Sequence, residues 1–309
     1  MNLKNKKILI TGSDGFLGRY VVEEFIKNGI PKQNLFLYKK SKFDYRKAQD
    51  CKRAVRSMDV VIHLAAMVGG IGLNIKKPGE LFYDNLIMGV QLMEEARKAK
   101  VEKFVALGTV CAYPKDTPIP FKEADLWKGY PESTNAPYGL AKKMLLVQSQ
   151  SYRKQYGFNS IYLLPVNLYG PGDSFNEGRS HVIPALIKKI VEAHNSGQKK
   201  VDVWGDGSAT REFLYVKDAA RAIFLATKKY SKSDPVNIGS GKEISIKNLV
   251  KLISSKVGLG GEIVWDKTKP NGQPRRMLDT SKAYKEFGFK SKVGFEEGLS
   301  ETIKWFNEQ

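Results

Sequence analysis

Cysteine is scarce in this chain, and long hydrophobic runs are absent. The 309 residues contain two cysteines, Cys51 and Cys111, which lie 60 positions apart and match no metal-ligand spacing. A disulfide framework and a structural zinc site are therefore not expected. No stretch approaches 18 consecutive apolar residues, and the first residues lack the apolar core of a signal peptide. These absences argue against a membrane protein and predict a protein of the cytoplasm.

Negative charge is also in short supply, since 51 lysines and arginines face 32 acidic residues and leave a net charge of +19. Such an excess raises the question of nucleic-acid binding. The lysines, however, are scattered in pairs along the chain and do not gather in one stripe interleaved with aromatic residues. The pattern disfavours a nucleic-acid partner and instead suits steering of small anions such as nucleotides.

What the sequence does contain is a regular alternation of strand-like and helix-like segments, with no repeats and no low-complexity linker. β-branched runs alternate with segments of helical apolar spacing. This alternation predicts an α/β protein with a doubly wound parallel sheet. The expected strands span residues 6–12, 34–40, 59–66, 103–109 and 159–166, and the expected helices span 16–29, 46–57 and 79–100, with a further helix that carries Tyr138.

A glycine motif, Gly12, Gly15 and Gly18, lies between the first expected strand and the first expected helix. Glycines at such a junction permit a tight turn and a close approach of the backbone to a pyrophosphate at the helix N-terminus. Its position predicts a dinucleotide site.

The end of the second expected strand distinguishes NAD from NADP. An acidic residue there would bind the ribose 2′-hydroxyl of NAD, but this chain has Lys39 and Lys40, whose charges suit the 2′-phosphate of NADP. NADP is therefore the expected cofactor, with NAD as the alternative. Asp44 follows shortly after and is expected either to contact the adenine or to cap the next helix.

Tyr138 and Lys142 lie four positions apart in a segment expected to be helical, so that both side chains share one face. A cation held beside a phenol lowers its pKa, which suits a proton donor or acceptor near neutral pH. Tyr-x-x-x-Lys alone is a common pattern in ordinary helices. It becomes informative here because a dinucleotide motif precedes it.

Together these features resemble the extended, nucleotide-sugar-modifying branch of the short-chain dehydrogenase/reductase superfamily, with Thr109 of "LGTVCAYPK" in the place of its catalytic Ser or Thr. The segments "HLAAMVGGI", "NLYGPGDSF", "SHVIPALIKK", "VWGDGSATREFLYVKDAA" and "KPNGQPRRMLDTSKA" are similar to those of the GDP-L-fucose synthase family, so the resemblance covers essentially the whole chain. It implies NADPH-dependent 3,5-epimerisation and 4-reduction of a GDP-linked 4-keto-6-deoxy sugar by a homodimer.

The resemblance implies a role for each site residue. Thr109, Tyr138 and Lys142 would serve reduction, while Cys111 and His181 would be the base and the acid of epimerisation. The implied cofactor site adds Phe16, Leu17, Leu64, Ala65, Ala66, Asn85, Tyr138, Lys142, Pro165, Asn167, Leu168 and His181 to the glycines, the two lysines and Asp44. The implied substrate site comprises Asn167, Val182, Lys189, Trp204, Arg211 and Arg275, and no metal is implied.

Three further expectations complete the prediction. Residues 1–168, with a returning segment near 212–240, are expected to form the nucleotide-binding domain, and the remainder of 169–309 the substrate lobe. His63 is expected to be a structural residue at the end of a strand. Because Thr109 and Val110 replace a Ser-Ser pair common in the family, a C4 epimerase or a simple 4-ketoreductase remains the alternative, and a non-catalytic dinucleotide sensor is a more remote one.

Overall fold

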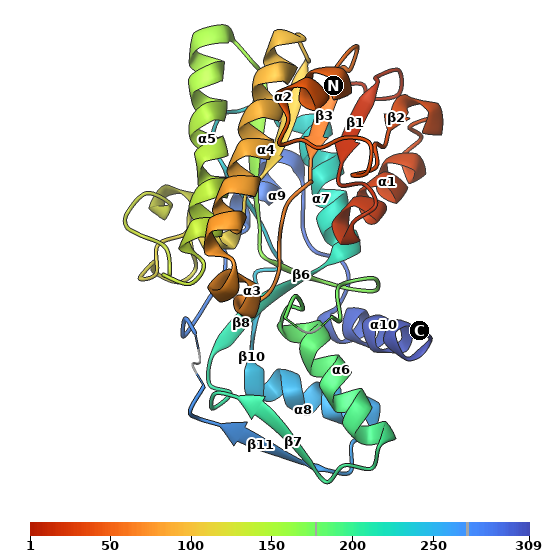
Figure 1. Ribbon diagram of the computed structural model, residues 1–309, viewed down its shortest axis with the longest axis vertical. Helices are drawn as coiled ribbons and strands as arrows, with labels where there is room; N and C mark the ends of the chain where they lie inside the picture. The colour runs from red at the N-terminus through yellow and green to blue at the C-terminus, as the bar shows by residue number, and fades with distance from the viewer. Residues whose placement is uncertain (177, 270–271) are drawn as a thin grey trace.

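A computed structural model describes residues 1–176, 178–269 and 272–309. Its larger part contains a six-stranded sheet in the order β2-β1-β3-β4-β5-β9, in which every neighbouring pair is parallel (Figure 1). The six strands are β1 (Ile8–Thr11), β2 (Leu35–Phe36), β3 (Val60–His63), β4 (Lys103–Leu107), β5 (Ser160–Pro165) and β9 (Val236–Ile238). Strands β1, β3 and β4 are buried along their whole length, as expected for a sheet covered on both faces.

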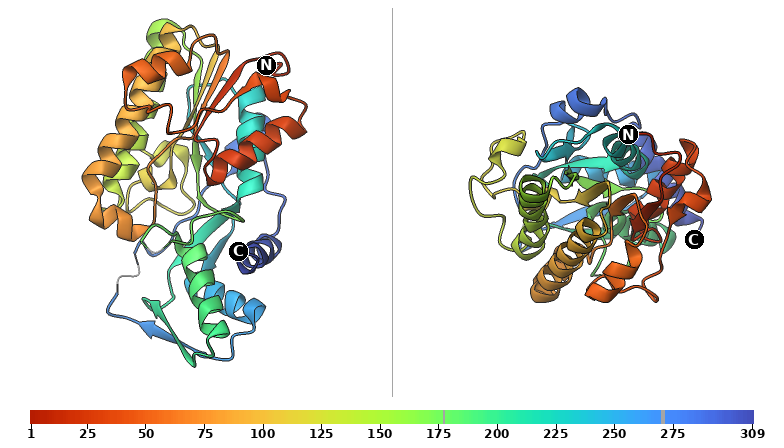
Figure 2. Two further views of the ribbon diagram at one scale, coloured as in Figure 1. Left: turned by 45° about the vertical axis from the view of Figure 1, so that its right-hand side comes forward. Right: turned by 90° about the horizontal axis from the view of Figure 1, so that it is seen from above.

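Helices cover both faces of this sheet, which confirms the predicted doubly wound fold (Figures 1 and 2). One layer contains α2 (Ala48–Ala54), α4 (Pro78–Lys98) and α5 (Ala136–Tyr156), and the other contains α1 (Phe16–Lys27), α7 (Val216–Lys229) and α9 (Ser281–Phe287). Four short helices lie in the connections, namely η1 (Lys32–Asn34), α3 (Ile71–Lys76), η2 (Val110–Ala112) and η3 (Glu123–Asp125). No helix in the described ranges is long and apolar enough to cross a membrane.

The order in which strands are added to the sheet changes side at β1, although all of them are parallel. From β1 the chain runs outward to β2 and then returns to place β3 on the opposite side of β1. In parallel α/β sheets, ligands bind beyond the carboxyl ends of the strands at such a switch point. The glycine-rich turn after β1 and the loop after β3 meet at this point.

The smaller part, in the lower half of Figure 1, has its own hydrophobic core. It is built from α6 (Val182–Asn195), α8 (Ile246–Val257) and α10 (Phe295–Asn307), the parallel pair β7 (Lys200–Trp204) and β11 (Glu262–Asp266), and a three-stranded sheet of β6 (Asn167–Tyr169), β8 (Thr210–Tyr215) and β10 (Glu243–Ser245). The buried members of this core all lie between Tyr169 and Ile303. The domain division at residue 168 stays a prediction.

Two local expectations differ from the structure. The strand expected over residues 34–40 is only Leu35–Phe36. A turn follows in which the Lys42 amide donates to the carbonyl of Lys39, so Lys39 and Lys40 are exposed beyond the strand. The strand expected to return to the large sheet with α7 is β8, but it joins the small sheet, and β9 is the sixth strand of the large one. Residue periodicity identifies a strand but not the edge to which it adds.

Candidate active site

The glycine-rich turn is closely packed against its surroundings. The Gly15 amide donates to the carbonyl of Gly12 at 3.1 Å, and Gly15 is the N-cap of α1. A Cβ on Gly18 would lie 2.0 Å from the Gly12 carbonyl oxygen, and Gly12 itself has a φ of +68° with the Ala65 backbone nitrogen 2.9 Å from a built Cβ. Side chains are thus excluded where a pyrophosphate would approach the start of α1. These residues fit a dinucleotide.

A buried hydrogen-bond chain ties the turn to the loop after β3. Thr11 Oγ1 accepts from the backbone amides of Leu64 and Ala65, each at 3.1 Å, and lies 3.0 Å from His63 Nδ1. With two donors already on the oxygen, the threonine hydroxyl donates to His63. Burial, followed by the charge of Lys142, lowers the pKa of His63 to about 3. His63 is therefore a neutral structural residue at the end of β3, as predicted.

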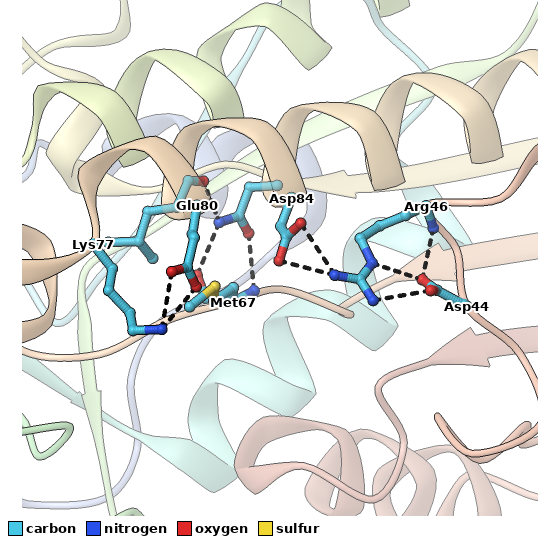
Figure 3. A network of polar contacts seen from close by, with 8 residues as sticks. Asp44, Arg46, Met67, Lys77, Glu80 and Asp84 are labelled. Carbon is cyan, nitrogen blue, oxygen red and sulfur yellow. Dashed lines mark hydrogen bonds and ion pairs between the residues drawn. The ribbon is translucent and has the colours of Figure 1, made fainter.

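Asn85 of α4 binds the same loop at Met67, which is labelled in Figure 3. Its side chain accepts from the Met67 amide at 3.1 Å and donates to the carbonyls of Met67 and Leu81 at 2.9 and 2.7 Å. The network drawn in Figure 3 also includes Arg46, which bridges Asp44 and Asp84. Asp44 does not cap α2, because the N-cap of that helix is Lys47 and no side chain caps it.

Three of the predicted catalytic residues come together where η2 meets α5. Thr109 is the N-cap of η2 and accepts from the Cys111 amide at 3.2 Å. The Tyr138 phenol lies near the Thr109 side chain, which lowers its pKa, and near Cys111, which raises it. Gly139 makes the approach possible, because a Cβ there would lie 2.3 Å from the Cys111 carbonyl oxygen.

Lys142 lies one helical turn beyond Tyr138 and is 2% exposed. Burial lowers the pKa of Lys142 to about 8 and raises the pKa of Tyr138 well above its ordinary value. The expectation that the lysine lowers the pKa of the phenol is wrong for this structure. Burial is the largest cause of both shifts, because it penalises the charged form of each group.

Arg276 is an active-site neighbour that the sequence analysis missed. Its Nη1 atom lies 3.6 Å from Cys111 Sγ, and the side-chain carbonyl of Gln273 accepts from its Nε and Nη2 at 3.1 and 3.0 Å. Gln273 in turn donates to the Lys115 carbonyl at 2.7 Å. The predicted residue Arg275 is exposed and pairs with Glu243. Both arginines occur in "QPRR", but only the tertiary structure distinguishes the one that faces the thiol.

His181 lies in a different part of the site. It is the N-cap of α6, and its Nδ1 atom is 4.0 Å from Asp173 Oδ1. Asp173 is a second residue that sequence reasoning missed, although it occurs in the quoted segment "NLYGPGDSF". The described contacts do not join His181 to Cys111 or Tyr138.

The remaining predicted site residues occupy the smaller part and its boundary with the large sheet. Arg211 is adjacent to both Cys111 and Arg276, and burial, then the charge of Arg276, lowers its pKa to about 10. Lys189 of α6 donates to the Asp202 carbonyl on β7, and Asn167 donates to the Glu212 carbonyl at 3.2 Å. Trp204, at the end of β7, is 56% exposed. Val182 begins α6, while Pro165 and Leu168 lie in β5 and β6. Their ligand-binding roles stay predictions.

Comparison with known proteins places these features in a family. The model of the NAD dependent epimerase/dehydratase family matches residues 8–239. The chain is 39% identical over 308 residues to probable GDP-L-fucose synthase 1 of Oryza sativa subsp. japonica, covering 99% of this chain and 93% of that protein.

Solved structures agree. A GDP-6-OMe-4-keto-L-xylo-heptose reductase from C. jejuni is 27% identical, with a TM-score of 0.92 over 100% of this chain and 99% of the other. A GDP-L-fucose synthetase from Naegleria fowleri bound to NADP is 27% identical, with a TM-score of 0.87 over 99% and 95%. With its glycine turn, its Thr109–Tyr138 contact and its full-length relatives, the chain belongs to the NAD dependent epimerase/dehydratase family, the extended short-chain dehydrogenase/reductase branch.

Proposed function

We propose that this protein converts GDP-4-keto-6-deoxy-D-mannose to GDP-L-fucose by epimerisation at C3 and C5 followed by NADPH-dependent reduction at C4. The sequence identity to a probable GDP-L-fucose synthase supports the substrate. The observation that carries the proposal is the position of Cys111, two residues from Thr109 and beside Tyr138 and Arg276. A thiol in this place supplies a base that reduction alone does not need.

Epimerisation requires a base on one face of the sugar and an acid on the other. The Cys111 thiolate removes the proton from a carbon next to the ketone, and the electron pair of the broken C–H bond moves onto the C4 oxygen as an enolate. Thr109 and Tyr138 donate hydrogen bonds to that oxygen. The His181 imidazolium then protonates the carbon from the opposite face, which restores the ketone with inverted configuration. Solvent returns the thiol and the imidazole to their starting states.

Reduction uses the same oxygen. The dinucleotide, when bound at the glycine turn, supplies the hydride for C4. Tyr138 donates its phenolic proton to the C4 oxygen as charge develops there, and Thr109 lies near the phenol. Lys142, one turn away on α5, would hold the ribose of the dinucleotide, the role that the family resemblance implies.

NADP is the proposed dinucleotide because the Naegleria fowleri relative is bound to NADP and because Lys39 and Lys40 are free of the strand and exposed. Replacement of both lysines by alanine is expected to weaken NADPH binding much more than NADH binding, since each lost charge-assisted contact is worth roughly 1.5–3 kcal/mol. Fluorescence titration with the two cofactors measures the difference. Equal losses for both would leave the lysines without a role in selectivity.

A simple 4-ketoreductase is the alternative function. The two functions differ in proton exchange. With GDP-4-keto-6-deoxy-D-mannose and NADPH in D₂O, we expect GDP-L-fucose with deuterium at C3 and C5 by NMR, and a Cys111→Ser variant should lose both labels. If wild-type enzyme gave a reduced product without deuterium at C3 or C5, the protein would be a simple 4-ketoreductase and the proposal would be wrong.

Location in the cytoplasm and assembly into a homodimer stay predictions. Cell fractionation tests the first and sedimentation equilibrium the second.

A further inference from the structure

Asp173 is a buried carboxylate without a complete set of partners. Its side chain is 5% exposed, and its Oδ1 atom accepts from the Ser174 amide at 2.7 Å. Its Oδ2 atom is buried, and no described residue forms a hydrogen bond with it. Burial of an ionised carboxylate with an unpaired oxygen lowers the stability of the fold unless a cation lies beside it. Among the described residues, the side chain at ion-pair distance is His181, whose Nδ1 atom lies 4.0 Å from Asp173 Oδ1.

His181 needs such a partner because of its place in the fold. It is the N-cap of α6, a helix of 14 residues, and its imidazole is 42% exposed. The positive end of a helix dipole disfavours a protonated imidazole. A general acid at this position must nevertheless carry a proton near neutral pH. A carboxylate on the other side of the ring opposes the helix end and favours the imidazolium.

The two residues are held in register by contacts at both ends of their loop. On the Asp173 side, Arg19 of α1 donates to the Gly172 carbonyl at 3.1 Å, and Tyr20 donates to the Pro171 carbonyl at 2.9 Å. The Arg19 guanidinium is thus bound to the backbone beside Asp173.

On the His181 side, the Gly70 amide donates to the Arg179 carbonyl at 3.0 Å, and a Cβ on Gly70 would lie 2.2 Å from the Ser180 carbonyl oxygen. Helix α1 and the loop after β3 therefore anchor the pair to the parts of the protein that form the dinucleotide site.

We propose that Asp173 is a positioning residue for epimerisation, which holds His181 in the orientation and protonation state of the general acid. The inference rests on the proposed function for the role of His181, and it extends that function to a residue outside the predicted site. Asp173 acts through the imidazole. Burial raises the pKa of Asp173, and the charge of His181 opposes that rise. In the proposed cycle the proton leaves His181 for the sugar carbon, and the neutral imidazole regains it from solvent.

The test compares Asp173→Asn with Glu192→Gln, a matched carboxylate-to-amide change on the exposed surface of α6. NMR of ring-¹³C-labelled histidine follows the full chain from pH 5 to 9, and a His181→Asn variant identifies the signal among the three histidines. Because an opposite charge within about 4–6 Å favours the charged form, removal of the Asp173 carboxylate should move the His181 signal change to lower pH. It should not move in Glu192→Gln.

The kinetic readout is the rate of deuterium exchange at C3 and C5. General acid catalysis contributes about 10²–10⁴-fold, so partial loss of the protonated form should slow exchange about tenfold at pH 8. The basic limb of the pH–rate profile should move to lower pH with KM unchanged, and Asp173→Glu should restore part of the rate. A uniform loss at every pH, or an unchanged His181 titration in Asp173→Asn, would overturn the proposal.

A second measurement tests the pairing if the variant does not fold. If Asp173→Asn does not fold, the ¹³Cγ signal of Asp173 in wild-type protein replaces it, because a paired Asp173 and His181 must report the same titration. Independent titrations would then contradict the pairing. The histidine titration needs no substrate, whereas failure of the proposed function would appear as wild-type enzyme that exchanges no deuterium.

Discussion

At the scale of one residue, the buried Lys142 is expected to serve function at a cost in stability. The side chain is 2% exposed, and among the described residues none accepts a hydrogen bond from its ammonium group. Burial lowers its pKa from 10.5 to about 8. The folded chain therefore binds fewer protons than the unfolded chain between pH 8 and 10.5, so the free energy of unfolding should rise with pH across that window.

We expect Lys142→Met to abolish reduction and yet to stabilise the fold. Below pH 8 the variant should be more stable by up to about 3 kcal/mol, because each unit of pKa shift corresponds to about 1.4 kcal/mol. This advantage should disappear as the pH approaches 10.5. Urea denaturation at pH 7, 9 and 10 measures it, with the exposed Lys154→Met on the same helix as the control. A variant less stable than wild type at pH 7 would contradict the account.

Arg276 is expected to activate Cys111 before any substrate binds. A guanidinium 3.6 Å from the sulfur favours the thiolate, which is the form that reacts with alkylating agents. Arg276→Met should therefore slow iodoacetamide labelling of Cys111 at pH 7. Mass spectrometry separates it from Cys51, which is fully buried. Arg275→Met, at the exposed neighbour, should leave the labelling rate unchanged, and equal slowing in both variants would argue against a specific contact.

At the scale of elements, a buried lysine joins β4 to the end of α7. Lys103 is 2% exposed, and its ammonium donates to the carbonyls of Ala226, Thr227 and Tyr230. The last carbonyls of a helix have no partner within the helix. The Lys103 ammonium provides a donor for them and so fixes α7 against the sheet. No motif in either segment predicts this contact.

We expect Lys103→Met to have the opposite effect to Lys142→Met. Its loss leaves the buried carbonyls of Thr227 and Tyr230 without their donor, whereas the Ala226 carbonyl still accepts from the Tyr230 amide, and the expected cost is about 3 kcal/mol. The midpoint of urea unfolding at pH 7 should fall, whereas Lys154→Met, on the surface of α5, should change it little. An unchanged midpoint would mean that water or a local shift replaces the lysine.

Long elements were predictable and short ones were not. The 21 residues of α4 follow from apolar periodicity, and the buried strands β3 and β4 follow from short, continuous runs of mostly apolar residues. The two-residue strand β2 is too short to have a period, and the expected strand extends four residues beyond it. Helix η2 spans three residues and forms because Thr109 accepts the Cys111 amide, a contact that no periodicity indicates.

At the scale of the molecule, the charge of +19 should accelerate the binding of an anionic cofactor. Electrostatic steering raises association rates by 10–10³-fold and is screened by salt. We expect the association rate of NADPH to fall about tenfold between about 0.05 and 0.5 M NaCl, with a smaller change in the dissociation rate. Stopped-flow fluorescence measures both, and sucrose at matched viscosity serves as the uncharged control. An association rate insensitive to salt would show that the lysines are too dispersed to create a directed field.

The sequence by itself determined the doubly wound fold and the place of the glycine turn, because each depends on neighbours in the chain or on a repeating period. The approach of Thr109, Cys111 and Tyr138 was implied by the family resemblance. Only the tertiary structure decided that Arg276 rather than Arg275 faces Cys111, that Asp173 faces His181, and that burial rather than Lys142 dominates the pKa of Tyr138. The pairings join segments from different parts of the chain or different ends of a loop. Burial depends on every element packed around a group, so no local pattern in the sequence carries this information.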